Sequence, residues 1–203
     1  MKLYGAPNPA PNPRRVRIFL AEKGIDLPET LVNMMMREHK AEDFVAKNSL
    51  GQIPILELDD GDIITETISI CRYLEGIHPD RPLFGTTPLE VAKIDMAIRR
   101  VEFQLMNPVG NFWRHAHPYT AKLLTQFKDF GESNREAVTR AMLWMDRELE
   151  GHDFIHGHSY TMADIAALTT VDFADWIGLP MPQDAKRLGA WHARVSARPS
   201  AAA

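Results

Sequence analysis

Cysteine is nearly absent from this chain, since Cys71 is the single one among 203 residues. One cysteine excludes an internal disulfide and any Cys-x-x-Cys redox pair. Cys71 stands among Ile68, Ile70 and Leu74, a pattern that favours a buried packing role within a helix. Redox chemistry through a pair of protein thiols is therefore excluded.

Long apolar runs and a strong charge of either sign are also missing. No stretch approaches the roughly 18 apolar residues of a membrane span, and Met1-Lys2-Leu3-Tyr4 leads into a strand and turn rather than into a signal peptide. The formal net charge of -4 argues against a nucleic-acid binder, because such proteins present a basic face. The cluster Arg14–Arg17 is too short to change this, and we expect a cytosolic, cytoplasmic protein.

The most informative stretch runs from Asn48 to Leu74. Pro54 donates no backbone hydrogen bond and holds the residue before it extended, so Ile53-Pro54 indicates a turn. If this bond is cis, the backbone N–H and C=O of Ile53 face outward, where an extended peptide can pair with them as with a strand edge.

A helix is expected to begin near Glu66, because Thr65-Glu66-Thr67 precedes apolar residues at helical spacing. Its free N–H groups and the positive end of its dipole suit a carboxylate. The Thr67 hydroxyl adds a donor, and the Glu66 carboxylate accepts from an ammonium. Taken singly, Pro54 favours a turn proline and Thr67 favours a helix cap. The order of the elements around them favours a site for an amino-acid head group.

The first 78 residues follow a βαβ-ββα order. The first helix of this order has Pro13 at its first position and ends at Gly24, and Asp60-Gly61 is a strong hairpin signal. The other expected elements are strands at 2–5, 30–33, 54–58 and 62–65 and helices at 41–48 and 66–77.

A segment rich in proline and glycine, residues 79–87, is the expected linker between two domains. Apolar residues then recur at threes and fours from Val91 to Leu105 and from Val138 to Leu149, which predicts an all-helical domain over 88–203. Thr161 and Asp164 form a capping-box pattern ahead of a further apolar helix.

In this order of elements the chain resembles the glutathione transferase superfamily, with phi-like and Nu-like bacterial features, over nearly its whole length. The resemblance implies an α/β plus all-α fold: a thioredoxin-like N-terminal domain (1–78) that binds glutathione, then an all-helical domain. It implies that Glu66 and Thr67 contact the γ-glutamyl group and that Ile53, followed by Pro54, contacts the cysteinyl backbone. The resemblance to phi-class and related bacterial enzymes also implies that His39, Lys40 and Gln52 contact the glycine carboxylate. Alone, His39-Lys40 is equally consistent with a solvated loop pair.

Catalysis in this family requires the glutathione thiol as thiolate, and a free thiol has a pKa of about 8.5. Aligning Arg14-Arg15-Val16 with the family pattern places Ala10 where a serine is expected, and alanine cannot donate to sulfur. Asn12 is the leading replacement and Asn8 the reserve, although both also suit a proline-rich turn. Tyr4, on the first strand, is expected to pack rather than react.

A hydrophobic co-substrate pocket is expected along the first helix of the second domain, where Phe103, Met106, Gly110 and Trp113 recur at helical intervals. The same stripe is also typical of a helix core. His115-x-His117 and His156-x-His158 lack the further ligands of a familiar metal site, so no metal is expected.

The resemblance implies a glutathione transferase of detoxification type, with glutathione as co-substrate, a small hydrophobic electrophile as its partner and a homodimer as its assembly. Two alternatives stay open. One is a glutathione-dependent peroxidase, reductase or ether-cleaving enzyme; the other is a non-catalytic glutathione-binding or regulatory protein, which Ala10 leaves open.

Overall fold

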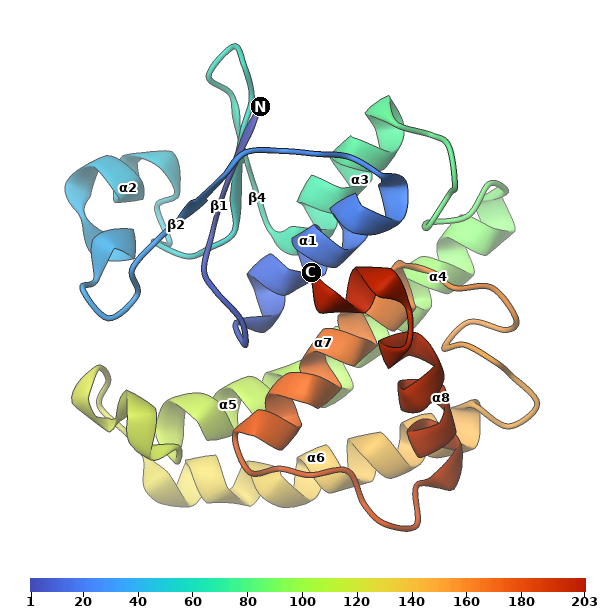
Figure 1. Ribbon diagram of the computed structural model, residues 1–203. Helices are drawn as coiled ribbons and strands as arrows, with labels where there is room; N and C mark the ends of the chain where they lie inside the picture. The colour runs from blue at the N-terminus through green and yellow to red at the C-terminus, as the bar shows by residue number, and fades with distance from the viewer. The chain divides into compact units, whose positions relative to one another are not determined.

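A computed structural model describes all residues, 1–203, and the chain divides into two compact units (Figure 1). The first comprises Met1–Pro82 together with Pro199–Ala203, and the second comprises Leu83–Arg198. None of the helices combines the length and the apolar character that a membrane span requires.

The first unit is built on a four-stranded sheet of order β2-β1-β3-β4. Strand β1 (Lys2–Gly5) runs parallel to β2 (Glu29–Leu31) and antiparallel to β3 (Ile55–Glu57), which pairs antiparallel with β4 (Ile63–Thr65). Its helices are α1 (Pro11–Lys23), η1 (Glu38–Lys40), α2 (Glu42–Lys47) and α3 (Thr67–Ile77). This is the thioredoxin-like order predicted from the sequence.

Helices cover both faces of this sheet, which explains why β3 is apolar at successive positions. Helices α1 and α3 lie together on one face and α2 lies on the other (Figure 1). Ile55 packs with Val32 and Phe44 of the α2 side. Leu56, also fully buried, points to the opposite face because side chains alternate along a strand.

The predicted start of helix α1 was wrong, and its predicted end is confirmed. The helix begins at Pro11, so Pro13 stands at its third position rather than its first. It ends at Gly24 as expected, in the left-handed conformation (φ 68°).

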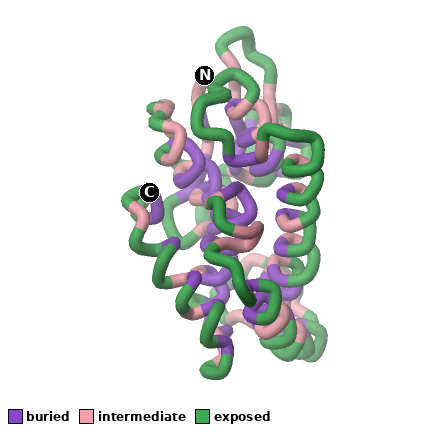
Figure 2. Tube along the Cα trace, turned by 90° about the vertical axis from the view of Figure 1, so that its right-hand side faces the viewer, coloured by how far each residue is buried: buried purple, intermediate pink, exposed green.

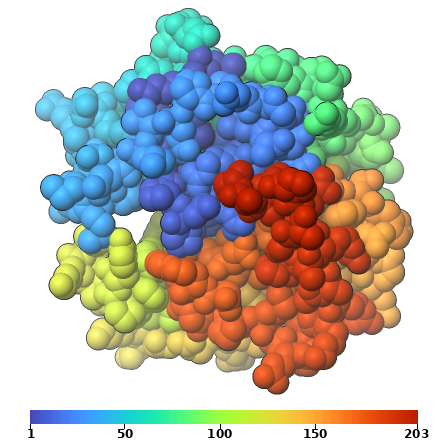
Figure 3. All heavy atoms as spheres, in the orientation of Figure 1, coloured from blue at the N-terminus to red at the C-terminus, as the bar shows by residue number.

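The terminal turn Pro199–Ala202 packs on α1, where Arg14 donates a hydrogen bond of 2.9 Å to the carbonyl of Ala201 (Figure 3).

The second unit is entirely helical, as predicted. It contains α4 (Pro88–Arg100), a π-helical segment η2 (Val101–Met106), α5 (Asn107–His115), η3 (Pro118–Lys122), α6 (Lys128–Glu148), α7 (Met162–Trp176) and α8 (Lys186–Ser196). Buried and exposed positions alternate along several of these helices, as amphipathic packing requires (Figure 2).

Helix α7 is the buried centre of this unit and is held by the predicted capping box. The Asp164 carboxylate accepts hydrogen bonds of 2.9 Å from Thr161 N, from Ile155 N and from the Trp191 indole N–H. Asp164 is fully buried, and burial raises its pKa, although these donors partly oppose that shift. One carboxylate therefore ties the start of α7 to a preceding loop and to α8.

Candidate functional site

The turn before β3 presents backbone groups that no other part of the chain uses. The Ile53-Pro54 peptide bond is cis. Asn48 holds the turn: its Nδ2 donates to the carbonyl of Gln52 at 2.9 Å, and its Oδ1 accepts from Leu50 N at 3.2 Å. Neither the N–H nor the C=O of Ile53 has a partner within the chain. Buried Asn48 is a supporting residue that sequence reasoning did not single out.

The segment η1 lies against this turn at Gly51, where the absence of a Cβ atom permits a close approach. The Lys40 ammonium donates a hydrogen bond of 2.9 Å to the carbonyl of Leu50. Gly51 has φ 53°, and a Cβ atom built on it would lie 2.6 Å from the His39 carbonyl oxygen and 2.9 Å from Lys40 Nζ. Only glycine tolerates both conditions, so Gly51 allows His39 and Lys40 to approach Gln52.

The two binding-site candidates in η1, His39 and Lys40, differ in their burial and charge. Lys40 is exposed, and after its one backbone contact the ammonium keeps two donors for a ligand. The Nδ1 atom of His39 is buried and has no hydrogen-bond partner. Burial, followed by the charges of Lys40 and Arg37, lowers the pKa of His39, so the imidazole is neutral at pH 7.

The N-terminus of α3 carries no cap from its own chain. Glu66 occupies the cap position with φ 66° and ψ 123°, and no side chain bonds to the first turn. The earliest helical hydrogen bond is from Ile70 N to Glu66 O, which leaves the N–H groups of Thr67, Ile68 and Ser69 unpaired. The positive φ of Glu66 is a feature that the sequence did not reveal.

The side chains at this helix end differ in burial and in charge. Thr67 is buried and its hydroxyl has no partner in the chain, while the Glu66 carboxylate is exposed. Unpaired N–H groups at the positive end of a helix dipole attract a carboxylate. An acidic side chain at the same point attracts an ammonium.

The start of α1 is poor in hydrogen-bond donors. Ala10, at the cap position, provides no side-chain bond, and Pro11 and Pro13 have no N–H. The first helical bond is from Arg14 N to Ala10 O at 3.3 Å. The backbone N–H of Asn12 is therefore the one donor that this first turn leaves unpaired.

The two asparagines of this loop are in different states. Asn12 is half-buried, and its side-chain amide has no partner within the chain. Asn8 is exposed, and its Oδ1 accepts a hydrogen bond of 2.5 Å from Arg17, while its Nδ2 donates weakly to Ala203 O at 3.5 Å. Asn12 is thus the asparagine whose amide is available.

Cys71 and Tyr4 are both engaged in packing. The Cys71 thiol is fully buried in α3, and burial raises its pKa far above the ordinary value. The Tyr4 hydroxyl donates a hydrogen bond of 2.6 Å to Glu57, and its ring packs edge-on to Phe44. Neither residue offers a reactive group to solvent.

In the second unit, Trp113 stands in a cluster of rings from α5, η3 and α7. Its ring centroid lies 5.2 Å from that of Tyr119, 5.3 Å from Phe173 and 5.6 Å from Trp176. Tyr119 and Trp176 are about half exposed, so the cluster presents an aromatic surface. These three partners were missed from sequence because they lie outside the helix that carries Trp113.

The other predicted pocket residues take different places in this unit. Phe103 is 58% exposed and makes no ring contact with the cluster, and Met106 contacts the Thr170 hydroxyl through sulfur at 3.8 Å. Both residues lie in the π-helical segment η2, where the number of residues per turn is larger than in an α-helix, so a count of 3.6 residues per turn does not hold from Phe103 to Trp113.

Both histidines of the His115-x-His117 pair have hydrogen-bond partners within the chain. His117 Nδ1 accepts from Tyr119 N at 3.3 Å, and His115 Nδ1 accepts from Phe127 N at 3.4 Å. Among His, Cys, Asp and Glu side chains, no group of three or more is placed to hold a metal ion.

A thioredoxin-like unit followed by an all-helical unit places the chain in a class of two-domain proteins with a thioredoxin-like N-terminal domain. Models of the glutathione S-transferase N-terminal and C-terminal domains match residues 10–77 and 114–199. The chain belongs to the glutathione S-transferase family, which confirms the resemblance seen in its sequence.

Relatives of known identity extend this match over nearly the full chain. "Glutathione S-transferase 2" of Saccharomyces cerevisiae is 36% identical, over 98% of this chain and 87% of the relative. The crystal structure of a glutathione S-transferase domain-containing protein from Marinobacter aquaeolei is 38% identical, with a TM-score of 0.92 over 98% of this chain and 99% of that one. The structure of Gtt2 from Saccharomyces cerevisiae has the same TM-score at 35% identity, with 98% of each chain covered.

Proposed function

We propose that this protein is a glutathione transferase that binds glutathione in its first unit, stabilises the thiolate and directs it at small hydrophobic electrophiles. The observation that carries the proposal is the set of unpaired polar groups around Ile53 and Thr67. A peptide backbone, a carboxylate and an ammonium are the groups that such a set pairs with. Glutathione brings all of them.

Each part of glutathione has a partner in this proposal. The backbone of Ile53, turned out before Pro54, pairs with the cysteinyl residue. Thr67 and the first N–H groups of α3 receive the γ-glutamyl carboxylate, and Glu66 receives its ammonium.

The glycine end of glutathione is assigned to the segment beside Gly51. Lys40 supplies a full positive charge there, and Gln52 and the neutral His39 supply directional hydrogen bonds. The short approach that Gly51 permits between η1 and the turn supports this assignment.

Asn12 is proposed as the residue that stabilises the thiolate. Its free side-chain amide and its backbone N–H both lie at the start of α1, where the helix dipole also favours a negative sulfur. Asn8 is the weaker candidate because its Nδ2, the group that would donate to sulfur, already donates to Ala203 O at 3.5 Å, while Arg17 holds the same side chain through Oδ1.

The co-substrate surface is assigned to the aromatic cluster around Trp113, with Met106 and Phe103 as the further residues expected from the sequence. Half-exposed rings suit an apolar or aromatic electrophile. A cytosolic homodimer completes the proposal, on the strength of family membership.

The decisive experiment follows the thiolate directly. Ultraviolet titration of bound glutathione gives the pKa of its thiol, and a chromogenic electrophile measures turnover, for wild type, Asn12→Ala and Asn8→Ala. The proposal expects a thiol pKa below the free value of about 8.5 in wild type and in Asn8→Ala, and a higher pKa with lower turnover in Asn12→Ala. Absence of glutathione binding by the wild type would refute the proposal as a whole.

A second candidate is a non-catalytic glutathione-binding protein, and one observation favours it. The first turn of α1 keeps a single backbone N–H because Pro11 and Pro13 have none. Tight binding of glutathione with an unshifted thiol pKa and no turnover would establish this candidate. Transfer through a protein mixed disulfide is disfavoured, because Cys71 is fully buried.

A further inference from the structure

The loop between α6 and α7, residues 149–161, contains three histidines that have no part in the proposed glutathione site. They are His152, His156 and His158. In the sequence His158 stands two residues after His156, but in the folded chain its ring lies beside that of His152. The centroids of these two exposed rings are 6.0 Å apart, and the ring planes meet at 85°.

Hydrogen bonds fix the loop that carries the two rings. The Asp153 N–H donates to the carbonyl of Gly157 at 3.1 Å, which folds His158 back toward the start of the loop. The Ile155 N–H donates to the buried Asp164 carboxylate at 2.9 Å, which ties the loop to the start of α7. The two rings therefore stand on a segment that is held at both of these points.

Each of the two rings has its Nδ1 atom next to a hydrogen-bond acceptor. The Nδ1 atom of His152 lies 3.0 Å from the carbonyl oxygen of Glu148. The Nδ1 atom of His158 lies 2.9 Å from Oδ2 of Asp153. A carbonyl or an ionised carboxylate can only accept, so Nδ1 carries the proton in both neutral imidazoles. The lone pair of each ring is then on Nε2, which has no partner within the chain.

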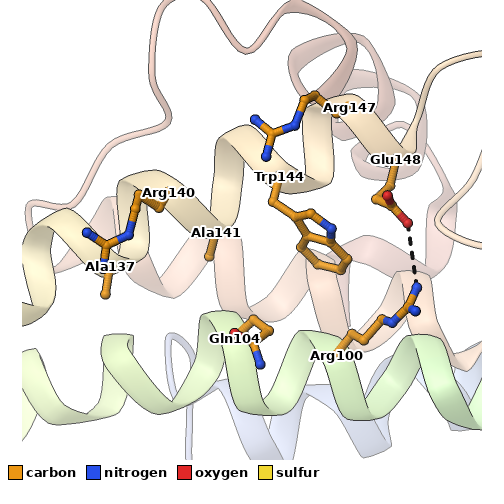
Figure 4. A pocket seen from close by; sticks show the side chains of 8 residues that line it. All are labelled: Arg100, Gln104, Ala137, Arg140, Ala141, Trp144, Arg147 and Glu148. Carbon is orange, nitrogen blue, oxygen red and sulfur yellow. Dashed lines mark ion pairs between the residues drawn. The ribbon is translucent and has the colours of Figure 1, made fainter.

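The two acceptors are themselves held in place. The Glu148 carbonyl is in the last turn of α6, where a helix leaves its carbonyl groups unpaired, while the Glu148 side chain pairs with Arg100 at 3.5 Å (Figure 4). The hydrogen bond from His158, together with the nearby charge of Arg194, lowers the pKa of Asp153, so this carboxyl is ionised at neutral pH. Arg194 of α8 also donates to the backbone carbonyl of Asp153.

Other histidines of this unit differ in the position of the free nitrogen. The Nδ1 atoms of His115 and His117 each accept a backbone N–H, so the proton of these rings is on Nε2. The Nε2 atom of His192 lies 2.6 Å from the Asp172 carboxylate and is therefore occupied. The pair in the loop between α6 and α7 combines neighbouring rings with two available Nε2 lone pairs.

We propose that His152 and His158 bind one divalent transition-metal ion, such as Ni²⁺ or Zn²⁺, through their Nε2 atoms. A ligating imidazole nitrogen lies about 2.1 Å from the ion, so two rings on one ion have centroids at most about 6.5 Å apart. The observed 6.0 Å is within this limit. A hydrogen bond from the second ring nitrogen to a carboxylate or a carbonyl is the usual support of a metal-binding histidine. Water supplies the remaining ligands, because no third side chain is in place.

Calorimetric titration with nickel chloride tests the proposal on the full chain without a histidine tag, in a buffer that does not chelate metal. Wild type is expected to bind one ion per chain. His152→Gln and His158→Gln should each weaken binding by roughly tenfold or more, because one of two protein ligands is lost. Asp153→Ala should also weaken binding by roughly tenfold, and Asp153→Asn by less, because its amide oxygen still accepts from Nδ1.

His78→Gln is the matched control, because His78 is an exposed histidine of the first unit whose side chain has no partner within the chain. Its affinity for Ni²⁺ should stay within about twofold of wild type. The same result is expected for His156→Gln, which removes the third histidine of the loop. Mg²⁺ should bind far more weakly than Ni²⁺, because Mg²⁺ prefers oxygen ligands.

Three results would overturn the proposal. One is no binding of Ni²⁺ by wild type at millimolar concentration. Another is binding that His152→Gln and His158→Gln leave unchanged while circular dichroism shows both variants folded. The third is equal weakening by His78→Gln or His156→Gln, which would show general adsorption to histidines rather than a site at this pair. Glutathione titration of the same samples without metal tests the proposed function separately, because none of these residues contributes to it.

Discussion

Replacement of Thr67 by valine isolates the hydroxyl that the proposed γ-glutamyl contact requires. Thr67 is 6% exposed, so Thr67→Ala would also remove buried volume, whereas valine keeps the branched shape. In the unliganded chain the hydroxyl has no partner, so valine breaks no internal hydrogen bond. The free energy of unfolding should therefore change by less than about 0.5 kcal/mol.

The effect on glutathione binding should be larger than the effect on folding. A hydrogen bond from a hydroxyl to a carboxylate contributes about 1.5 to 3 kcal/mol. The unpaired N–H groups of Thr67, Ile68 and Ser69 remain in the variant, so we expect a loss near the lower limit, which is roughly tenfold in Kd. Calorimetric titration with glutathione measures this loss, and urea unfolding measures stability.

Ser69→Ala is the matched control, because Ser69 is exposed in the same helical turn and the variant keeps its N–H. Its Kd should stay within about twofold of wild type. Equal affinity of Thr67→Val and wild type, with the fold intact, would refute the assignment of the hydroxyl. An equal loss in both variants would point to the helix end as a whole rather than to Thr67.

Three further predictions concern the structure around the site. Gly51→Ala should lower the free energy of unfolding by about 2 kcal/mol or more and weaken glutathione binding, since alanine meets both a positive φ and the His39 carbonyl; urea unfolding and calorimetry measure the two effects. His39 has a lowered pKa in the folded chain, so the unfolded chain binds its proton first as pH falls below about 6.5. Stability from this residue is therefore present above that pH and lost below it, and His39→Gln should reduce the fall in unfolding free energy between pH 7.5 and pH 5.5. Asp164→Asn should cost about 1 to 3 kcal/mol, because an amide NH₂ cannot accept the Thr161 N–H, and a thermal melt should show a lower Tm.

Matched variants separate these effects from general destabilisation. Gly24→Ala bears a similar positive φ with no atom near the added Cβ, so it should cost less than Gly51→Ala. Asp175→Asn changes an exposed carboxylate on the same helix as Asp164 and should leave the Tm nearly unchanged. A pH dependence that is identical in wild type and His39→Gln would contradict the role assigned to that imidazole.

Much of the fold was readable from local patterns in the sequence. The Asp60-Gly61 hairpin, the helix that follows Glu66 and the Thr161 capping box are all present. Each depends on residues within a few positions of one another, where backbone preference and hydrogen bonding decide the conformation. The start of α1 was misplaced by two residues, because Pro11 and Pro13 both suit the first turn of a helix.

Contacts between distant residues could not be predicted in this way. The sequence alone indicated a family and a set of ligand-binding candidates from His39 to Thr67. Only the tertiary structure shows that Arg17 donates a hydrogen bond to Asn8 Oδ1, whereas the side chain of Asn12 has no partner. It also shows that the absence of a Cβ atom at Gly51 lets η1 lie against the turn before β3. It also joined Trp113 to rings on η3 and α7. These arrangements depend on the packing of separate elements, which the spacing of residues along one element does not specify.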